Sequence, residues 1–238
     1  MPKAPALSIA KDKKSLFVAC INDGVYRSDD EGETWVKKSN GIGKSGNLNV
    51  YALKFDKKGN IYCSVTRKKK DGSFVSETET GGLYKSEDRG ENWTCLKELG
   101  FAMNFDFDPT NDQTIYLAAS DAQFAKTKVN HEGGVYRSAD GGKTWEKAMV
   151  TDRKIADWTT FGCFDVAVHP TKPNVVFATW KTNEPTGGIA YSTDRGKTWK
   201  EYDKVPFLYP NRITIDGDEI YLTTFGSGVW KKKLRTFE

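Results

Sequence analysis

The stretch GGVYRSADGGKTW at residues 133–145 decides the fold, because its pattern occurs four times along the chain. The other copies read YRSDDEGETW at 26–35, YKSEDRGENW at 84–93 and YSTDRGKTW at 191–199. All four reduce to Ser-x-Asp-x-Gly-x-Thr-Trp, with Asn92 in place of the threonine once. The tryptophans recur every 52 to 58 residues, a regularity that is typical of repeat architectures. Four copies argue against a catalytic motif.

A second repeat lies between the motifs. Five segments alternate apolar and polar residues around a short polar turn, at 7–20, 51–65, 103–119, 164–179 and 212–224. Alternation with a period of two predicts pairs of β-strands. A third strand leads from each hairpin into the motif, and a fourth begins near its tryptophan. The last copy, GSGVWKKK at 226–233, stops short of the motif.

The repeating unit therefore predicts an all-β fold, a β-propeller with five four-stranded blades and four Asp-containing turns, which form either a complete ring or part of a larger propeller. The fifth blade would use residues 234–238 as its outer strand or lack one. We expect a single domain over residues 1–238, with its five blades at about 5–46, 47–99, 100–149, 159–205 and 208–238.

The motif itself predicts a structural turn. Its aspartate can accept hydrogen bonds from backbone N–H groups, its glycine can adopt a positive φ, and its tryptophan ring is expected to pack into the core beside the turn. A calcium loop would need several spaced oxygen ligands and a terminal glutamate, which the motif lacks. We expect this role for all four aspartates, Asp30, Asp88, Asp140 and Asp194.

Composition excludes several classes of function. The net charge of +4 is too small to indicate nucleic acid as a partner, and the basic run RKKK at 67–70 is interpreted as a solvated loop. No apolar run is long enough for membrane insertion or a signal peptide. Four dispersed cysteines and two histidines do not form a zinc motif, so neither a metal nor another cofactor is predicted. We expect a secreted or periplasmic protein whose signal is absent from this sequence, with a cytoplasmic location as the alternative.

The motif resembles the Asp-box, or BNR repeat, of sialidase, xyloglucanase, sortilin and photosystem assembly-factor propellers. The resemblance implies a propeller but no single activity, because these families include enzymes, receptors and assembly factors. Sialidases bring three arginines together at the centre, whereas only Arg212 is well placed here. Xyloglucanases place one catalytic aspartate in each of two propellers, and this chain holds one propeller's worth of sequence.

Long loops on one side of the predicted propeller, together with the first strand of each blade, indicate where a ligand would bind. Carboxylates there could act as the acid and the base or nucleophile of a glycosidase, and aromatic rings could stack on sugars. The catalytic candidates are Asp165, Asp157 and Asp106. The candidates for ligand binding are Asn104, Arg212, Trp158, Trp180, Tyr209 and Glu184.

Two functions follow from this pattern. The first is a propeller that binds a glycan or polysaccharide, with hydrolysis through the carboxylates left open. The alternative is a non-catalytic platform of the sortilin or assembly-factor kind that binds a protein or peptide. Sugar binding should depend on tryptophan and little on salt, whereas binding through Lys68, Lys69 and Lys70 should weaken as the salt concentration rises.

Overall fold

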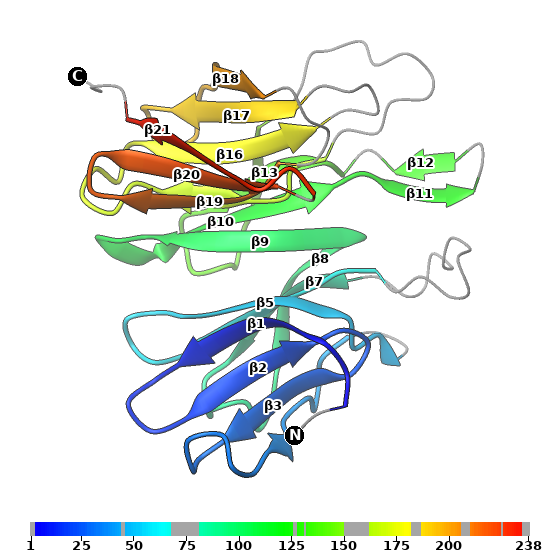
Figure 1. Cartoon of the computed structure of the whole chain (residues 1–238). Coiled ribbons are helices and arrows are strands. Elements are labelled where there is room, and N and C mark those ends of the chain that lie inside the picture. The colour runs from blue at the N-terminus through cyan, green and yellow to red at the C-terminus, as the bar shows by residue number, and fades with distance from the viewer. Residues whose placement is uncertain are drawn as a thin grey trace. The chain divides into compact units, whose positions relative to one another are not determined.

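A computed structural model describes residues 3–43, 46–67, 81–125, 128–130, 132–149, 162–181, 187–205, 210–224 and 226–234. Within these ranges the chain forms antiparallel strands and no α-helix (Figure 1). Five sheets follow one another along the sequence, each built from consecutive strands. These sheets are the blades of a β-propeller, so the fold class predicted from the repeats is confirmed.

The first two sheets have four strands each. The first comprises β1 (Ala6–Lys11), β2 (Leu16–Cys20), β3 (Gly24–Ser28) and β4 (Val36–Lys37). The second comprises β5 (Val50–Phe55), β6 (Ile61–Val65), β7 (Gly81–Ser86) and β8 (Thr94–Leu99). Both belong to one compact unit, which includes residues 1–103 and 123–130.

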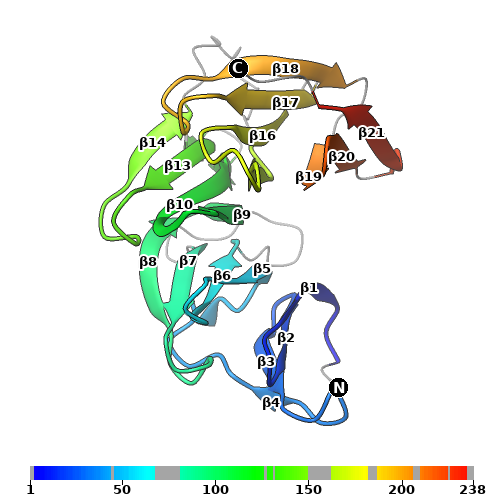
Figure 2. The same cartoon turned by 90° about the vertical axis from the view of Figure 1, so that its left-hand side faces the viewer.

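The other three sheets belong to a second compact unit, residues 104–122 and 131–238. The third sheet comprises β9 (Phe101–Asp108), β10 (Asn111–Ser120), β13 (Gly134–Ser138) and β14 (Glu146–Met149). The fourth comprises β15 (Val166–Val168), β16 (Val176–Lys181), β17 (Gly187–Ser192) and β18 (Lys200–Val205) in this order, and Figure 2 shows β16, β17 and β18 side by side. The fifth comprises β19 (Pro210–Asp216), β20 (Glu219–Thr224) and β21 (Val229–Lys233).

Two details differ from the predicted scheme. The fifth sheet has three strands among the described residues, and residues 235–238 lie outside them. A short hairpin of β11 (Ala122–Ala125) and β12 (Lys128–Asn130) occurs where the sequence predicted only a long loop. The boundary between the two units falls within β9, and the prediction of a single domain stays a prediction.

The core lies between the faces of successive sheets. In one cluster Phe17, Ala19 and Val25 of the first sheet pack against Leu53, Ile61, Cys63 and Tyr84 of the second. In another cluster Phe177 and Ile189 of the fourth sheet pack against Ile213, Ile220 and Leu222 of the fifth. Each strand therefore alternates residues that face the preceding sheet with residues that face the next one.

We call these two sides the incoming and the outgoing face of a sheet. Register defines them, because residues directly opposite each other on antiparallel strands lie on the same face. In the first sheet Phe17 pairs with Ala10 and Arg27 on the outgoing face, and Val18 pairs with Ile9 on the incoming face.

Candidate functional site

The Asp-containing turn is a closed hydrogen-bonded unit, and the third copy shows its parts. The hydroxyl group of Ser138 donates to Asp140 Oδ1 over 2.8 Å and accepts from the backbone N–H of Gly142 over 2.8 Å. The Asp140 carboxylate accepts from the backbone N–H of Thr144 at 2.9 Å and from its hydroxyl at 2.6 Å. Gly142 has a φ of 92°, and its carbonyl accepts from Trp145 Nε1 at 2.9 Å. The predicted roles of the aspartate and the glycine are confirmed.

The other copies repeat these bonds, with one addition and one difference. The serine of the motif, to which the sequence assigned no role, is buried in every copy and connects the aspartate to the glycine N–H (Ser28, Ser86, Ser138 and Ser192). Only one of the four tryptophans, Trp93, is buried, whereas Trp35, Trp145 and Trp199 are half-buried. The tryptophan ring therefore covers the turn in most copies instead of entering the core.

These hydrogen bonds predict a loss of stability in acid. The bonds from Thr34 to Asp30 lower the pKa of that carboxyl to about 2, and the pKa values of Asp88, Asp140 and Asp194 are also lowered to about 2. The four carboxyl groups bind protons less tightly in the folded state than in the unfolded chain. Their ionised forms therefore stabilise the folded state fully above the ordinary pKa of 3.8, and this stabilisation is lost as the pH falls below it. We expect the urea midpoint of unfolding to fall steeply between pH 4 and pH 2.

A set of urea titrations at pH 7, 4, 3 and 2.5 measures this slope. Replacing all four aspartates with asparagine, which keeps an acceptor oxygen but does not titrate, is the control and should flatten the dependence on pH. A wild-type midpoint that stays constant down to pH 2.5 would show that the four carboxylates do not act in this way.

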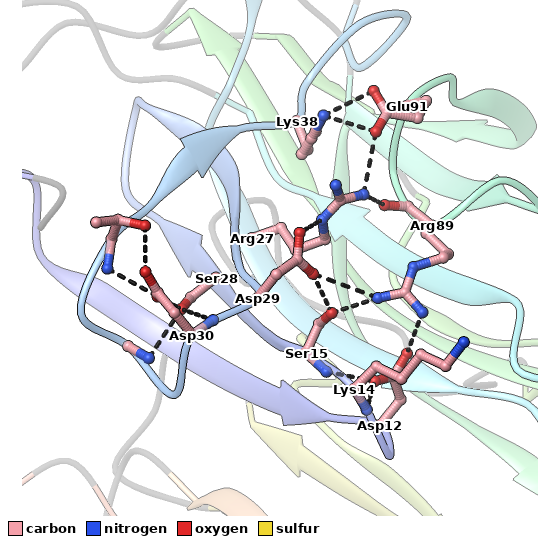
Figure 3. Close-up of polar contacts among 12 residues, drawn as sticks. Asp12, Lys14, Ser15, Arg27, Ser28, Asp29, Asp30, Lys38, Arg89 and Glu91 are labelled. Carbon is pink, nitrogen blue, oxygen red and sulfur yellow. Dashed lines mark hydrogen bonds and ion pairs between the residues drawn. The ribbon is translucent and has the colours of Figure 1, made fainter.

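The turns also join neighbouring sheets. In the first unit the guanidinium of Arg89, which lies in the second Asp-containing turn, donates to the Ser15 hydroxyl and pairs with Asp12 at 3.5 Å and Asp29 at 3.4 Å (Figure 3). From the first sheet Arg27 and Lys38 both pair with Glu91, at 3.0 and 2.6 Å. Figure 3 shows this network beside the hydrogen bonds of Asp30.

The second unit contains a more buried version of the same contact. Arg195, from the fourth copy of the motif, pairs with the fully buried carboxylate of Asp108, and its carbonyl accepts from the Tyr116 hydroxyl at 3.0 Å. Burial alone would raise the pKa of Asp108, but hydrogen bonds from Thr110 and the positive charge of Arg195 outweigh it and lower the pKa. Arg89 and Arg195 thus hold the turns of adjacent sheets together.

The predicted ligand site contains a second set of such connections. Asp165 lies just before β15 and is only 2 % exposed. Its Oδ1 accepts from the side-chain amide of Asn104 on β9 at 2.6 Å, and its Oδ2 accepts from the backbone N–H of Ile213 on β19 at 2.7 Å. The carboxylate thereby joins the first strands of the third, fourth and fifth sheets. The sequence named both Asn104 and Asp165 as site candidates, and the structure brings these two side chains into contact.

The remaining described candidates are also engaged within the protein. Asp106, which is half-buried, accepts from the backbone N–H of Val168 through Oδ2 at 2.9 Å. Arg212 is half-buried, and its backbone N–H donates to Thr223 Oγ1 at 3.1 Å. Trp180 lies on β16 and is 6 % exposed, so its ring does not form an open platform. The other candidates, Asp157, Trp158, Glu184 and Tyr209, lie outside the described residues.

One pattern explains why the carboxylates of Asp106 and Asp165 accept hydrogen bonds from backbone N–H groups of the next sheet. The first strand of each blade has another strand on one side only, so N–H groups on its other edge need acceptors from elsewhere. Side chains of the preceding sheet supply them: Ser8 accepts from Leu53, Asp106 from Val168 and Asp165 from Ile213. Within the described residues these carboxylates therefore satisfy backbone donors of the next sheet.

His169 has a comparable turn role. Its Nδ1 accepts from the backbone N–H groups of Thr171 and Lys172, at 3.3 and 3.2 Å. Burial lowers the pKa of its imidazole, and the charge of Lys172 lowers it further, which favours the neutral acceptor. No group of three or more metal-binding side chains occurs among the residues that the structure describes. Nor do these residues include a helix long and apolar enough to span a membrane.

Comparisons with known proteins identify the repeats. The BNR/Asp-box repeat model matches residues 136–147 and 190–201, and a BNR-Asp box repeat model matches residues 83–96. Vacuolar protein sorting/targeting protein PEP1 of Saccharomyces cerevisiae is 27% identical over 201 residues, which is 72% of this chain and 12% of that protein. A xyloglucanase of a Paenibacillus species is 23% identical over 262 residues, 94% of this chain and 23% of the enzyme.

A solved structure agrees on the fold. The GH74 xyloglucanase from Xanthomonas campestris superposes with a TM-score of 0.73 at 15% identity, over 97% of this chain and 36% of the enzyme. The chain thus spans a small part of the curated relatives and about a third of that enzyme. This chain is thus a β-propeller that contains Asp-box, or BNR, repeats.

Proposed function

We propose that this chain binds a polysaccharide through the long loops of the propeller, and that its inner carboxylates hold the blades together and do not cleave the bound sugar chain. One observation supports the proposal that the inner carboxylates do not cleave the sugar chain. Asp165 is buried, and each of its carboxylate oxygens accepts a hydrogen bond from a neighbouring sheet. A glycosidase needs one carboxyl that protonates the leaving oxygen and a second that faces the sugar ring.

The engagement of Asp106 supports the same conclusion. Its Oδ2 accepts from the backbone N–H of Val168 on β15, so this carboxylate, like that of Asp165, connects two neighbouring sheets. Binding, by contrast, requires only aromatic faces and hydrogen-bonding groups at the surface. The similarity to xyloglucanases over most of the chain supports a plant-type glucan as the class of ligand.

Binding is measured by affinity electrophoresis in gels that contain soluble xyloglucan. We expect the wild-type protein to be retarded and Trp158→Ala to lose about tenfold in affinity, because a stacked ring contributes about 1–1.5 kcal/mol. Trp230→Ala is the control, since Trp230 is a partly exposed tryptophan on β21 that is not among the candidates for ligand binding. Equal retardation in gels with and without xyloglucan would refute polysaccharide binding.

A second function is favoured by the similarity to PEP1, which covers 72% of this chain. In that case the propeller is a platform for a protein or peptide, and Lys68, Lys69 and Lys70 are its candidate contacts. The salt dependence separates the two functions, because exposed charge contacts are screened at high ionic strength and ring stacking is not.

A further inference from the structure

The sequence contains a single Asn–Gly pair, Asn40–Gly41, shortly after β4. An asparagine that precedes glycine is prone to lose its side-chain amide, because no side chain keeps the glycine nitrogen away from the side-chain carbonyl carbon. The pair packs against the second Asp-containing turn, and both segments belong to the first compact unit. This contact decides which residues can occupy positions 40 and 41.

The backbone around Gly41 requires a glycine. Its φ is 88°, a conformation that residues with a side chain rarely adopt. A Cβ atom at this position would lie 2.4 Å from the carbonyl oxygen of Trp93, so a larger residue would displace the turn. Within the part of the chain that the structure describes, the Gly41 N–H donates no hydrogen bond. Its nitrogen is therefore not held by another group.

The side chain of Asn40 begins a chain of two amide hydrogen bonds between the first and second sheets. Its Nδ2 donates to Asn92 Oδ1 at 2.7 Å, and Asn92 Nδ2 donates to Asp88 Oδ2 at 2.8 Å. The Asn40 carbonyl also accepts from the backbone N–H of Trp93 at 2.9 Å. Asn92 is the residue that replaces the threonine of the motif, and its amide serves both neighbours. The fold thus places a glycine and an amide side chain in adjacent positions.

We propose that Asn40 is a site of spontaneous deamidation in the folded protein, and that the product weakens the contact between the first and second sheets. The Gly41 nitrogen attacks the side-chain carbonyl carbon of Asn40 and forms a C–N bond. The bond from this carbon to Nδ2 breaks, and Nδ2 leaves as ammonia with the proton of the Gly41 N–H. Water then opens the cyclic succinimide at either of its carbonyls, which leaves aspartate or isoaspartate at position 40. No oxidation or reduction occurs, and water is the only further reactant.

The new carboxylate at position 40 does not replace the amide. A carboxylate only accepts hydrogen bonds, so it would face Asn92 Oδ1 with no proton between the two oxygens. Asn92 could turn its Nδ2 toward the carboxylate only by giving up its hydrogen bond to Asp88. An isoaspartate would also displace the carbonyl that accepts from Trp93, because the main chain then runs through the former side chain. Each product therefore removes at least one hydrogen bond from this contact.

Incubation of the folded protein at pH 8.5, followed by tryptic digestion and mass spectrometry, tests the proposed site. Trypsin releases residues 39–44 as one peptide, in which Asn40 is the only asparagine. We expect this peptide to gain the mass difference between a carboxyl and an amide, and to do so faster than at pH 5.5, because the attacking nitrogen must lose its proton. Asn111 is the internal control, since it is also exposed but precedes Asp112, and it should convert far more slowly.

Urea unfolding before and after incubation tests the consequence. The modified fraction of the wild type should unfold at a lower urea concentration, and Asn40→Asp should show this lower midpoint without incubation. Asn40→Gln is the matched control, because it keeps an amide but its longer side chain cyclises much more slowly, so its midpoint should not change on incubation. The loss caused by Asn40→Asp should be smaller when Asn92→Ala is also present, because no acceptor oxygen then faces the carboxylate.

Two results would overturn the proposal. The first is an unmodified peptide from the folded wild type under conditions in which the urea-unfolded protein is converted, because Asn40 would then be protected by the fold. The second is conversion without a change of midpoint, together with an Asn40→Asp midpoint equal to that of the wild type, because the amide would then not stabilise the contact.

Discussion

Replacing Asp165 with alanine should lower the free energy of unfolding by about 3–5 kcal/mol, because three buried donors lose their acceptor at once and each such loss costs about 1–3 kcal/mol. The donors are the amide of Asn104 and the backbone N–H of Ile213, which come from two other sheets, and the backbone N–H of the neighbouring Val166. Urea unfolding followed by tryptophan fluorescence measures the change. Asp165→Asn should cost less, about 1–3 kcal/mol, since the amide keeps one acceptor oxygen.

A double-mutant cycle shows whether the loss belongs to this network. Asn104→Ala combined with Asp165→Ala should be less destabilising than the sum of the single changes, because the Asn104 amide no longer needs an acceptor. Additive effects would mean that the two side chains act independently. If Asp165→Ala left stability unchanged or raised it, the carboxylate would not be a structural connection, and a strained functional role would be the better explanation.

The second large effect is expected at Asp108. Its carboxylate is fully buried and accepts from the backbone N–H and the hydroxyl of Thr110 as well as from Arg195. Asp108→Ala should therefore cost about 2–4 kcal/mol, because the N–H and the hydroxyl of Thr110 lose their buried acceptor, whereas the guanidinium of Arg195 is 40% exposed and stays solvated. Thermal and urea unfolding of the variant measure the loss.

The first unit offers a matched comparison for Asp108. Asp29 pairs with Arg89 in the corresponding network, but its side chain is 56% exposed. Asp29→Ala should cost at most about 1 kcal/mol, because exposed ion pairs are solvated and screened. Equal losses for the two variants would contradict the argument that burial sets the importance of these contacts.

The fold could be predicted because its determinants are local. The serine, aspartate and glycine of each turn lie within five residues of one another, and the alternation in each hairpin spans one strand pair. The same reasoning did not predict the β11–β12 hairpin, whose sequence carries neither a repeat nor a Gly-containing turn. It also overestimated the burial of the tryptophans, because that burial depends on contacts from the neighbouring sheet. The carbonyl of Lys38, for example, accepts a hydrogen bond from Nε1 of the buried Trp93.

The candidate site could be predicted only in part. The sequence selected Asn104 and Asp165 as candidates, and in the structure Asn104 Nδ2 lies 2.6 Å from Asp165 Oδ1. Polarity alone could not distinguish a ligand-binding carboxylate from one that accepts a backbone N–H of the next sheet, since that contact joins residues as distant in sequence as Asp165 and Ile213. The unsatisfied edge of the first strand was the available signal, because its N–H groups require acceptors.

The most direct test of the central claim is a measurement of new reducing ends in soluble xyloglucan incubated with the wild-type protein and with Asp165→Asn. We expect the wild type to bind the polysaccharide and to release no reducing ends, and Asp165→Asn to bind equally well at a temperature where both are folded. Release by the wild type that disappears in Asp165→Asn, with unfolding midpoints that are the same for both, would contradict the proposed binding function and make Asp165 a catalytic residue.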